Sequence, residues 1–209
     1  MANWFDSVPM SKVTELLYIG NNGNGAHLID ENLLDIRAVL NVGTELPYHH
    51  HPDIQYCSIE FHDGIEIPEC AFKNCMAFLH FQEDLGRRTL VHCAAGISRS
   101  PSIVAAYLFH SKKVHSLDEA FFCVRLARGI VHPHPLIVRS IKKHLKVWPY
   151  DGSMGNAIEE TKSIQSSEFI EMIRKHPDPL CAVRMAFGEE LAPGIEFHQI
   201  VCTCGQKHQ

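Results

Sequence analysis

A short segment in the middle of the chain combines a nucleophile with groups that bind anions. Cys93 begins a loop of small residues, and the loop ends at Arg99. Residues 89–91 are typical of a short strand, and Pro101 suits the first turn of the helix that residues 101–111 predict. A strand, a tight loop and a helix N-terminus together form an anion cradle, because successive backbone N–H groups turn inward beside the positive end of the helix dipole.

A phosphate group is the anion that this loop is predicted to hold. Gly96 allows the backbone to curl, and Arg99 can offer two N–H groups to two phosphate oxygens. The N–H groups, the helix dipole and the guanidinium favour the thiolate form of Cys93, which is then an in-line nucleophile for phosphoryl transfer. The predicted phosphate-binding residues are Ala94, Ala95, Gly96, Ile97, Ser98 and Arg99.

Four neighbours of the loop are candidates for supporting roles. The Ser100 hydroxyl could donate a hydrogen bond to the Cys93 sulfur and help it to leave in a second step. His92 either fixes the loop from beneath or simply packs at the end of a strand. Arg125 and Arg128 close a later helix, and they are either solvated charges or residues that line the mouth of the cleft.

Asp63 is the candidate general acid and base. It follows a strand predicted over residues 54–61, and it stands on a loop upstream of Cys93. A carboxylic acid above the cleft can give a proton to the departing oxygen, and the carboxylate can then activate water. The alternative is an ordinary turn residue before glycine. Other carboxylates that could take the role are Asp53, Glu60 and Glu66.

The residues of this segment resemble a known family signature. His92-Cys93, five further residues to Arg99, and Ser100 resemble the signature of the cysteine-based protein phosphatases, and the fuller run of residues 91–101 is similar to their dual-specificity branch. The resemblance covers about residues 11–147. It implies a protein phosphatase that removes phosphate from tyrosine and from serine or threonine, with Asp63 at the position of the general acid. His134 departs from the family pattern, which usually has asparagine after Pro133.

The substrate class is inferred from side chains that the loop lacks. Lipid-directed relatives carry lysine in this loop, whereas Ala94, Ala95, Ile97 and Ser98 are neutral. A phosphorylated protein is therefore the expected partner. The alternatives are a catalytically weak module that binds phosphoproteins, and a phosphatase that acts on a non-protein phosphate ester.

Strand and helix patterns alternate along the chain and predict an α/β fold with a mostly parallel central sheet flanked by helices. Strands are expected at residues 12–19, 36–42, 54–61 and 89–93, and helices at 26–34, 69–85, 101–111 and 136–148. A further helix is expected after Ser116, which caps it, with Arg125 and Arg128 near its end. The run Gly20–Gly25 predicts a turn. We expect a cysteine-phosphatase-like catalytic domain over residues 1–148 and an extension of unknown role over residues 149–209, with a helix at 157–175 and a strand at 195–202.

Composition excludes several other classes of protein. The formal charge of −5 argues against a nucleic-acid-binding protein that acts through bulk positive charge. No signal peptide or long apolar run is visible, so we expect no membrane segment. The eight cysteines then indicate free thiols in the cytoplasm. Neither the three histidines at residues 49–51 nor the cysteines and histidines near the C-terminus have the usual zinc spacing, so no metal and no cofactor is expected.

Overall fold

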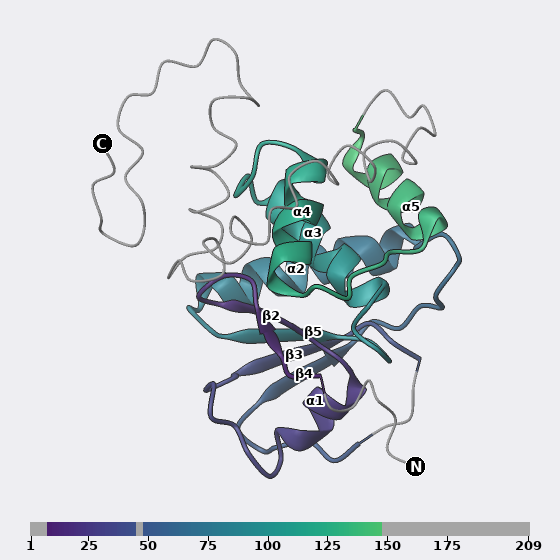
Figure 1. Ribbon diagram of the computed structural model, residues 1–209. Coiled ribbons are helices and arrows are strands. Elements are labelled where there is room, and N and C mark those ends of the chain that lie inside the picture. Colours follow the sequence, from purple (N-terminus) through teal and green to yellow (C-terminus); the bar gives the residue numbers. More distant parts are fainter. Residues whose placement is uncertain (1–7, 45–47, 148–209) are drawn as a thin grey trace, which may run out of the picture.

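The computed structural model describes residues 8–44 and 48–147, which contain a five-stranded sheet. Helices lie on both faces of this sheet (Figure 1). In sheet order the strands are β1 (Ser11–Lys12), β2 (Leu17–Gly20), β5 (Thr89–His92), β3 (Ala38–Asn41) and β4 (Gln55–Ser58). The edge strand β1 pairs antiparallel with β2, and every other neighbouring pair is parallel. The predicted α/β fold with a mostly parallel sheet is therefore confirmed.

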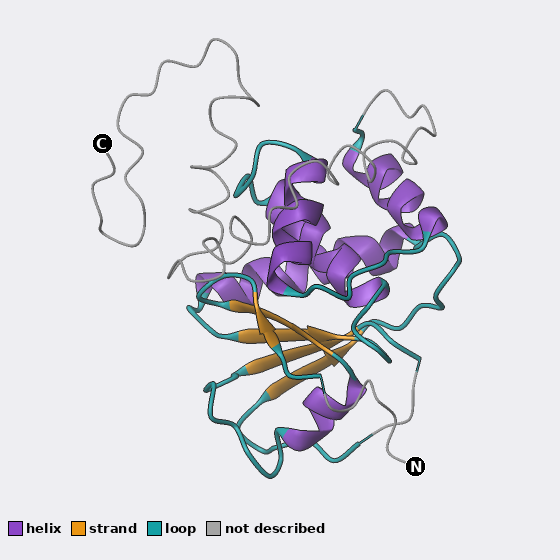
Figure 2. Cartoon of the chain, viewed as in Figure 1, coloured by secondary structure: helices purple, strands orange, loops and turns teal. Residues whose placement is uncertain are grey.

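The helices α2 (Glu69–Asp84), α3 (Arg99–His110), α4 (Leu117–Ala127) and α5 (Pro135–Leu145) cover one face of the sheet, and the short helix α1 (Asn22–His27) lies on the other face (Figure 2). None of the helices in the described part of the chain is long and apolar enough to cross a membrane.

Alternating side chains of the inner strands divide the apolar core between the two faces of the sheet. In β5, Val91 joins a large cluster with the four helices, whereas Leu90 joins a smaller cluster on the side of α1. Residues 100–108 of α3 are buried without interruption. Because α3 has the sheet on one side and the other three helices around it, it has no solvent-facing stripe over this length. The loop that precedes α3 is therefore held between two rigid elements.

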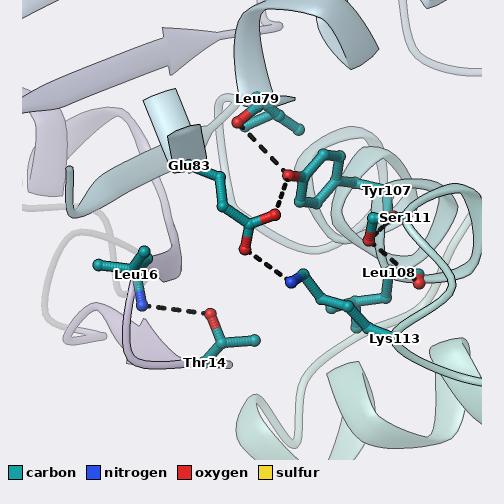
Figure 3. A network of polar contacts seen from close by, with 8 residues as sticks. All are labelled: Thr14, Leu16, Leu79, Glu83, Tyr107, Leu108, Ser111 and Lys113. Carbon is teal, nitrogen blue, oxygen red and sulfur yellow. Dashed lines mark hydrogen bonds and ion pairs between the residues drawn. The ribbon is translucent and has the colours of Figure 1, made fainter. Parts of the chain in front are cut away.

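A polar network ties the C-terminal parts of α2 and α3 together, away from that loop (Figure 3). The Tyr107 hydroxyl lies 2.6 Å from a carboxylate oxygen of Glu83 and 3.5 Å from the Leu79 carbonyl oxygen, and Lys113 Nζ lies 2.6 Å from the other Glu83 oxygen. Burial acts to raise the pKa of Glu83, but the hydrogen bonds from Lys113 and Tyr107 outweigh it and lower that pKa overall. The carboxylate is thus held in its charged form between two donors.

The N-terminal elements differ from the prediction. The strand expected over residues 12–19 is a hairpin of β1 and β2, because the N–H groups of Val13 and Thr14 turn back to the Leu17 carbonyl oxygen at 2.8 and 3.1 Å. The turn expected at Gly20–Gly25 is instead the start of α1. Asn21 and Asn24 cap it reciprocally, each side chain accepting from the other's backbone N–H at 2.8 and 2.9 Å.

The helix expected over residues 26–34 is consequently wrong, since α1 ends at His27. The remaining strands and helices lie within a few residues of their predicted positions. The helix expected over 157–175 and the strand expected over 195–202 fall outside the described residues.

Candidate active site

The loop that begins at Cys93 leaves the carboxyl end of the central strand β5. That strand lies between β2 and β3, with Gly20 and Asn41 as the neighbours of His92 in the register. Open parallel sheets bind their ligands at this edge. The sequence prediction of strand, loop and helix is confirmed, and the helix α3 begins at Arg99.

The carbonyl groups of the loop are anchored outward, toward the surrounding protein. The Ala94 carbonyl accepts from the Asn22 N–H at 3.0 Å, which links the loop to α1. The Ile97 carbonyl accepts from the His132 N–H at 2.9 Å, which links it to the segment between α4 and α5. The two carbonyls between them are bound by an arginine side chain.

That arginine is Arg128, which follows α4 and is 2% exposed. Its Nε donates to the Gly96 carbonyl at 2.8 Å, and its Nη2 donates to the Ala95 carbonyl at 3.5 Å. Nη1 donates to the Pro9 carbonyl and to the Ser11 hydroxyl at 2.9 and 3.2 Å. Burial lowers the pKa of Arg128, while the nearby Cys93 sulfur acts in the opposite direction. Neither sequence interpretation of Arg128 was right, because the side chain braces the loop from below.

Outward carbonyls turn the intervening N–H groups to the opposite side of the loop. No backbone N–H of residues 94–98 donates a hydrogen bond to another group within residues 8–44 and 48–147. Backbone N–H groups that the fold leaves unpaired need an acceptor, and a tetrahedral oxyanion supplies several acceptors at once. The geometry of the loop is therefore that of an anion cradle.

Gly96 is required at the bend of the cradle. Its φ is +68°, a left-handed conformation that residues with a Cβ rarely adopt. A Cβ at this position would lie 2.5 Å from the Gly20 carbonyl oxygen and 2.7 Å from Nη2 of Arg128. Both the backbone angle and the space around it exclude a larger residue.

The candidate nucleophile lies at the base of the loop, next to a hydroxyl. Cys93 is 2% exposed, and its sulfur lies 3.4 Å from Ser100 Oγ. The Ser100 hydroxyl is also 3.4 Å from the Gly20 carbonyl oxygen, so it is held between β2 and the sulfur. The contact that the sequence suggested between these two residues is present.

Arg99 links the cradle to the segment that follows β4. It is the first residue of α3, it is buried, and its Nη1 donates to the Phe61 carbonyl at 3.2 Å. Phe61 comes two residues before the candidate general acid. The Arg99 side chain thus links the end of the phosphate loop to the segment that carries Asp63.

Asp63 reaches the cradle through a hydrogen bond. Its Oδ1 accepts from the Gly64 N–H at 2.9 Å and from the Ser98 hydroxyl at 2.8 Å. One of the other candidate carboxylates, Glu66, forms an ion pair with Lys143 of α5 at 3.2 Å. Of these two carboxylates, Asp63 is the one bonded to the loop that begins at Cys93.

His134 takes the place of the family's usual asparagine without breaking the local structure. Its Nδ1 accepts from the Leu136 N–H at 3.3 Å, so the imidazole caps α5. Its backbone N–H donates to the Ser98 hydroxyl at 3.0 Å. The link between this turn and the cradle therefore uses the backbone of His134, and the side chain has a separate role.

His92 is buried beneath the loop and has a partner that sequence reasoning missed. Its Nε2 lies 2.6 Å from the Tyr48 hydroxyl. Burial lowers the pKa of His92 to about 4, so the imidazole is neutral at pH 7. No local pattern could have indicated Tyr48, which is forty-four positions from His92 and lies in a loop next to the histidine run.

Two other cysteines of the described segments, Cys57 and Cys75, have thiols with a raised pKa. All five described cysteines are free, namely Cys57, Cys70, Cys75, Cys93 and Cys123. Burial, and secondarily the proximity of Cys57, raises the pKa of Cys75 to about 12, and burial also raises the pKa of Cys57. These two thiols are protonated at neutral pH and are poor nucleophiles.

Sequence comparison identifies a protein family and individual proteins that are similar to this chain. The sequence profile "Dual specificity phosphatase, catalytic domain" matches residues 17–146. Human dual specificity protein phosphatase 2 is 36% identical over 124 residues, which are 59% of this chain and 39% of that protein. Mouse dual specificity protein phosphatase 1 is 35% identical over 124 residues, 59% of this chain and 34% of that protein. The chain therefore aligns with about two fifths or less of these relatives.

Solved structures show the same fold. A mouse dual specificity phosphatase crystallised with zinc tungstate superposes with a TM-score of 0.59 at 27% identity, over 66% of this chain and 87% of that one. The crystal structure of DUSP15 superposes with a TM-score of 0.58 at 27% identity, over 74% of this chain and 96% of that one.

Proposed function

Because the chain belongs to the dual-specificity phosphatase catalytic-domain family, we propose that it hydrolyses phosphate esters on tyrosine and on serine or threonine of proteins. A cysteinyl-phosphate intermediate is general to this family. The observation that carries the proposal is the outward anchoring of the four carbonyls of residues 94–97, which leaves the N–H groups of the loop available for a phosphate group.

In the first step the Cys93 thiolate attacks the phosphorus of the bound phosphate. A sulfur–phosphorus bond forms while the bond to the substrate oxygen breaks, and Asp63 gives its proton to that departing oxygen. Arg99 and the N–H groups of residues 94–98 stabilise the negative charge on the phosphoryl oxygens that do not leave.

In the second step water hydrolyses the cysteinyl-phosphate. Asp63, now a carboxylate, takes a proton from the water as its oxygen attacks phosphorus. The sulfur leaves as a thiolate, and the Ser100 hydroxyl 3.4 Å away stabilises it by donating a hydrogen bond. Phosphate is released, and the cycle returns to its starting state.

We assign to His92 the role of fixing the end of β5, from which the phosphate loop leaves. A neutral imidazole bonded to Tyr48 fixes the end of β5 without adding a charge beside the nucleophile. The catalytic domain in this proposal comprises residues 1–148, since the family match ends at residue 146 and α5 ends at Leu145. Residues 149–209 form an extension whose role is open.

A phosphorylated protein is the proposed partner, because the half-buried side chains of Ala94, Ala95 and Ile97 carry no positive charge for a lipid headgroup. We place the protein in the cytoplasm, where the free thiols of the described cysteines stay reduced.

Hydrolysis of a nitrophenyl phosphate in the presence of a metal chelator tests the proposal. Wild type and Cys93→Ser are compared, and phosphopeptides with phosphotyrosine or phosphothreonine then determine the preference. Activity in wild type that is lost in Cys93→Ser supports the proposal. A folded wild type that binds phosphopeptides without hydrolysing them would indicate a binding module. Activity that survives in Cys93→Ser would show that the loop is not the catalytic site.

A further inference from the structure

Ser98 stands at the N-cap of α3 but does not cap the helix. An N-cap serine normally accepts a hydrogen bond from the backbone N–H two or three residues later. Here the Ser98 side chain makes no such bond, and the residue three positions later is Pro101, which has no N–H. The N–H of Ser100, two positions later, therefore donates no hydrogen bond to the Ser98 side chain.

The Ser98 hydroxyl instead connects two distant loops. It lies 2.8 Å from Asp63 Oδ1 and 3.0 Å from the backbone nitrogen of His134. A backbone N–H can only donate, so the hydroxyl must accept from His134 and give its single proton to Asp63. Ser98 is 7% exposed, whereas Asp63 is on an exposed loop. A buried hydroxyl group thus holds a carboxyl group that lies on an exposed loop.

The two oxygens of the Asp63 carboxyl are consequently not equivalent. Both donors, the Ser98 hydroxyl and the Gly64 N–H at 2.9 Å, reach Oδ1. An oxygen that already accepts two hydrogen bonds is the carbonyl-like oxygen of a protonated carboxyl group. Oδ2 is then the oxygen that carries the proton.

We propose that Ser98 is a positioning residue that orients Asp63 so that Oδ2 delivers the proton to the leaving group. The proposal rests on the assignment of Asp63 as general acid made above. It predicts that the Ser98 hydroxyl matters only for substrates whose leaving oxygen needs a proton.

The test compares two aryl phosphates by kcat/KM, which reports the step that forms the cysteinyl-phosphate. Phenyl phosphate has a basic leaving group that needs protonation, whereas dinitrophenyl phosphate does not. A general acid accelerates a reaction by about 10²–10⁴-fold, and loss of its alignment removes part of that acceleration. For phenyl phosphate we expect kcat/KM to fall about tenfold in Ser98→Ala. For dinitrophenyl phosphate, kcat/KM should change less than about twofold in the same variant.

A double-mutant cycle separates positioning from a structural effect. In an Asp63→Ala background, the further change Ser98→Ala should have no effect on phenyl phosphate, because no acid remains to be oriented. Ser102→Ala serves as the matched control, since its buried hydroxyl lies in the same helix turn and donates to the Ser98 carbonyl at 2.7 Å. Ser98→Gly repeats the test if alanine impairs folding, because glycine is tolerated at N-caps.

The positioning role would be overturned if Ser98→Ala lowered kcat/KM equally for both substrates. It would also be overturned if Ser98→Ala still lowered kcat/KM for phenyl phosphate in the Asp63→Ala background. If Asp63→Ala itself lowers kcat/KM equally for both substrates, Asp63 is not the general acid. The assignment of Asp63 then fails together with the positioning role of Ser98. A loss confined to phenyl phosphate in both single variants supports both assignments.

Discussion

Nε of Arg128 lies 2.8 Å from the carbonyl oxygen of Gly96, although the two residues are thirty-two positions apart. This bond, with the second one to Ala95, fixes the middle of the phosphate loop from the end of α4. A buried guanidinium that satisfies several carbonyls is costly to remove, because each carbonyl then loses a charged donor inside the protein.

Arg128→Lys should therefore weaken both the fold and the cradle. Lysine keeps the charge but cannot bond to four acceptors from one planar group. We expect a loss of about 2 kcal/mol or more in the free energy of unfolding and about tenfold weaker inhibition by inorganic phosphate. Urea unfolding and phosphate inhibition measure the two effects. Arg125→Lys in the last turn of α4 is the matched control, and equal losses in the two variants would contradict the bracing role.

Alanine substitutions at Gly96 and Gly86 separate the effect of backbone strain from the effect of a steric clash with the added Cβ. Both have positive φ values, +68° and +64°, but a Cβ on Gly86 would meet nothing within 4 Å. Gly86→Ala should cost about 1–2 kcal/mol of stability and leave kcat/KM unchanged. Gly96→Ala should cost more and lower kcat/KM about a hundredfold, because the added carbon displaces the loop or Arg128. Similar kinetics in the two variants would argue against a close fit around Gly96.

Tyr48→Phe tests the support beneath the loop. Removal of the hydroxyl leaves Nε2 of the buried His92 without its partner, which should cost about 1–3 kcal/mol in urea unfolding. Tyr56→Phe is the control, since the Tyr56 hydroxyl accepts at 3.2 Å from the N–H of the half-buried His51, whereas the partner of Tyr48 is the fully buried His92. A smaller loss for Tyr48→Phe than for Tyr56→Phe would refute the role of Tyr48.

The local signals in the sequence were sufficient for the centre of the site. A β-prone run, a glycine and a proline-containing helix start lie within about a dozen residues of one another, so β5, the loop and the start of α3 could be predicted together. The same holds for the Ser100 contact, because Ser100 lies on the first turn of the helix behind Cys93.

The supporting residues could not be predicted, because their contacts join segments that are far apart in the sequence. The contacts of Arg128 with Gly96, of Tyr48 with His92 and of Ser98 with Asp63 span thirty-two to forty-four positions. The helix α1 was missed for a different reason. Glycine and asparagine favour turns by propensity, but the reciprocal Asn21–Asn24 cap stabilises a helix in their place.

The buried His92 should make the stability of the protein depend on pH. Its pKa is about 4 in the folded state and about 6.5 when unfolded, so between these values the unfolded chain binds a proton that the folded one does not. The stabilisation is present above pH 6.5 and is lost as the pH falls toward 4. We expect about 2 kcal/mol of loss from this group between pH 7 and pH 5.

Urea unfolding of wild type and His92→Asn at pH 7 and pH 5 isolates this contribution. The variant should show a pH dependence smaller by about that amount, whatever its own stability, because asparagine does not titrate. The same pH dependence in both proteins would mean that His92 becomes protonated without cost in the folded state.

Trapping of the phosphorylated enzyme tests most directly whether Cys93 carries the phosphoryl group. Wild type is mixed with an aryl phosphate, quenched within the first turnover and digested, and the peptides are identified by mass. We predict one added phosphoryl group on the peptide that contains Cys93, and none on the same peptide of Cys93→Ser. A phosphoryl group on a different residue, or the same rate of hydrolysis in Cys93→Ser as in wild type, would contradict the mechanism.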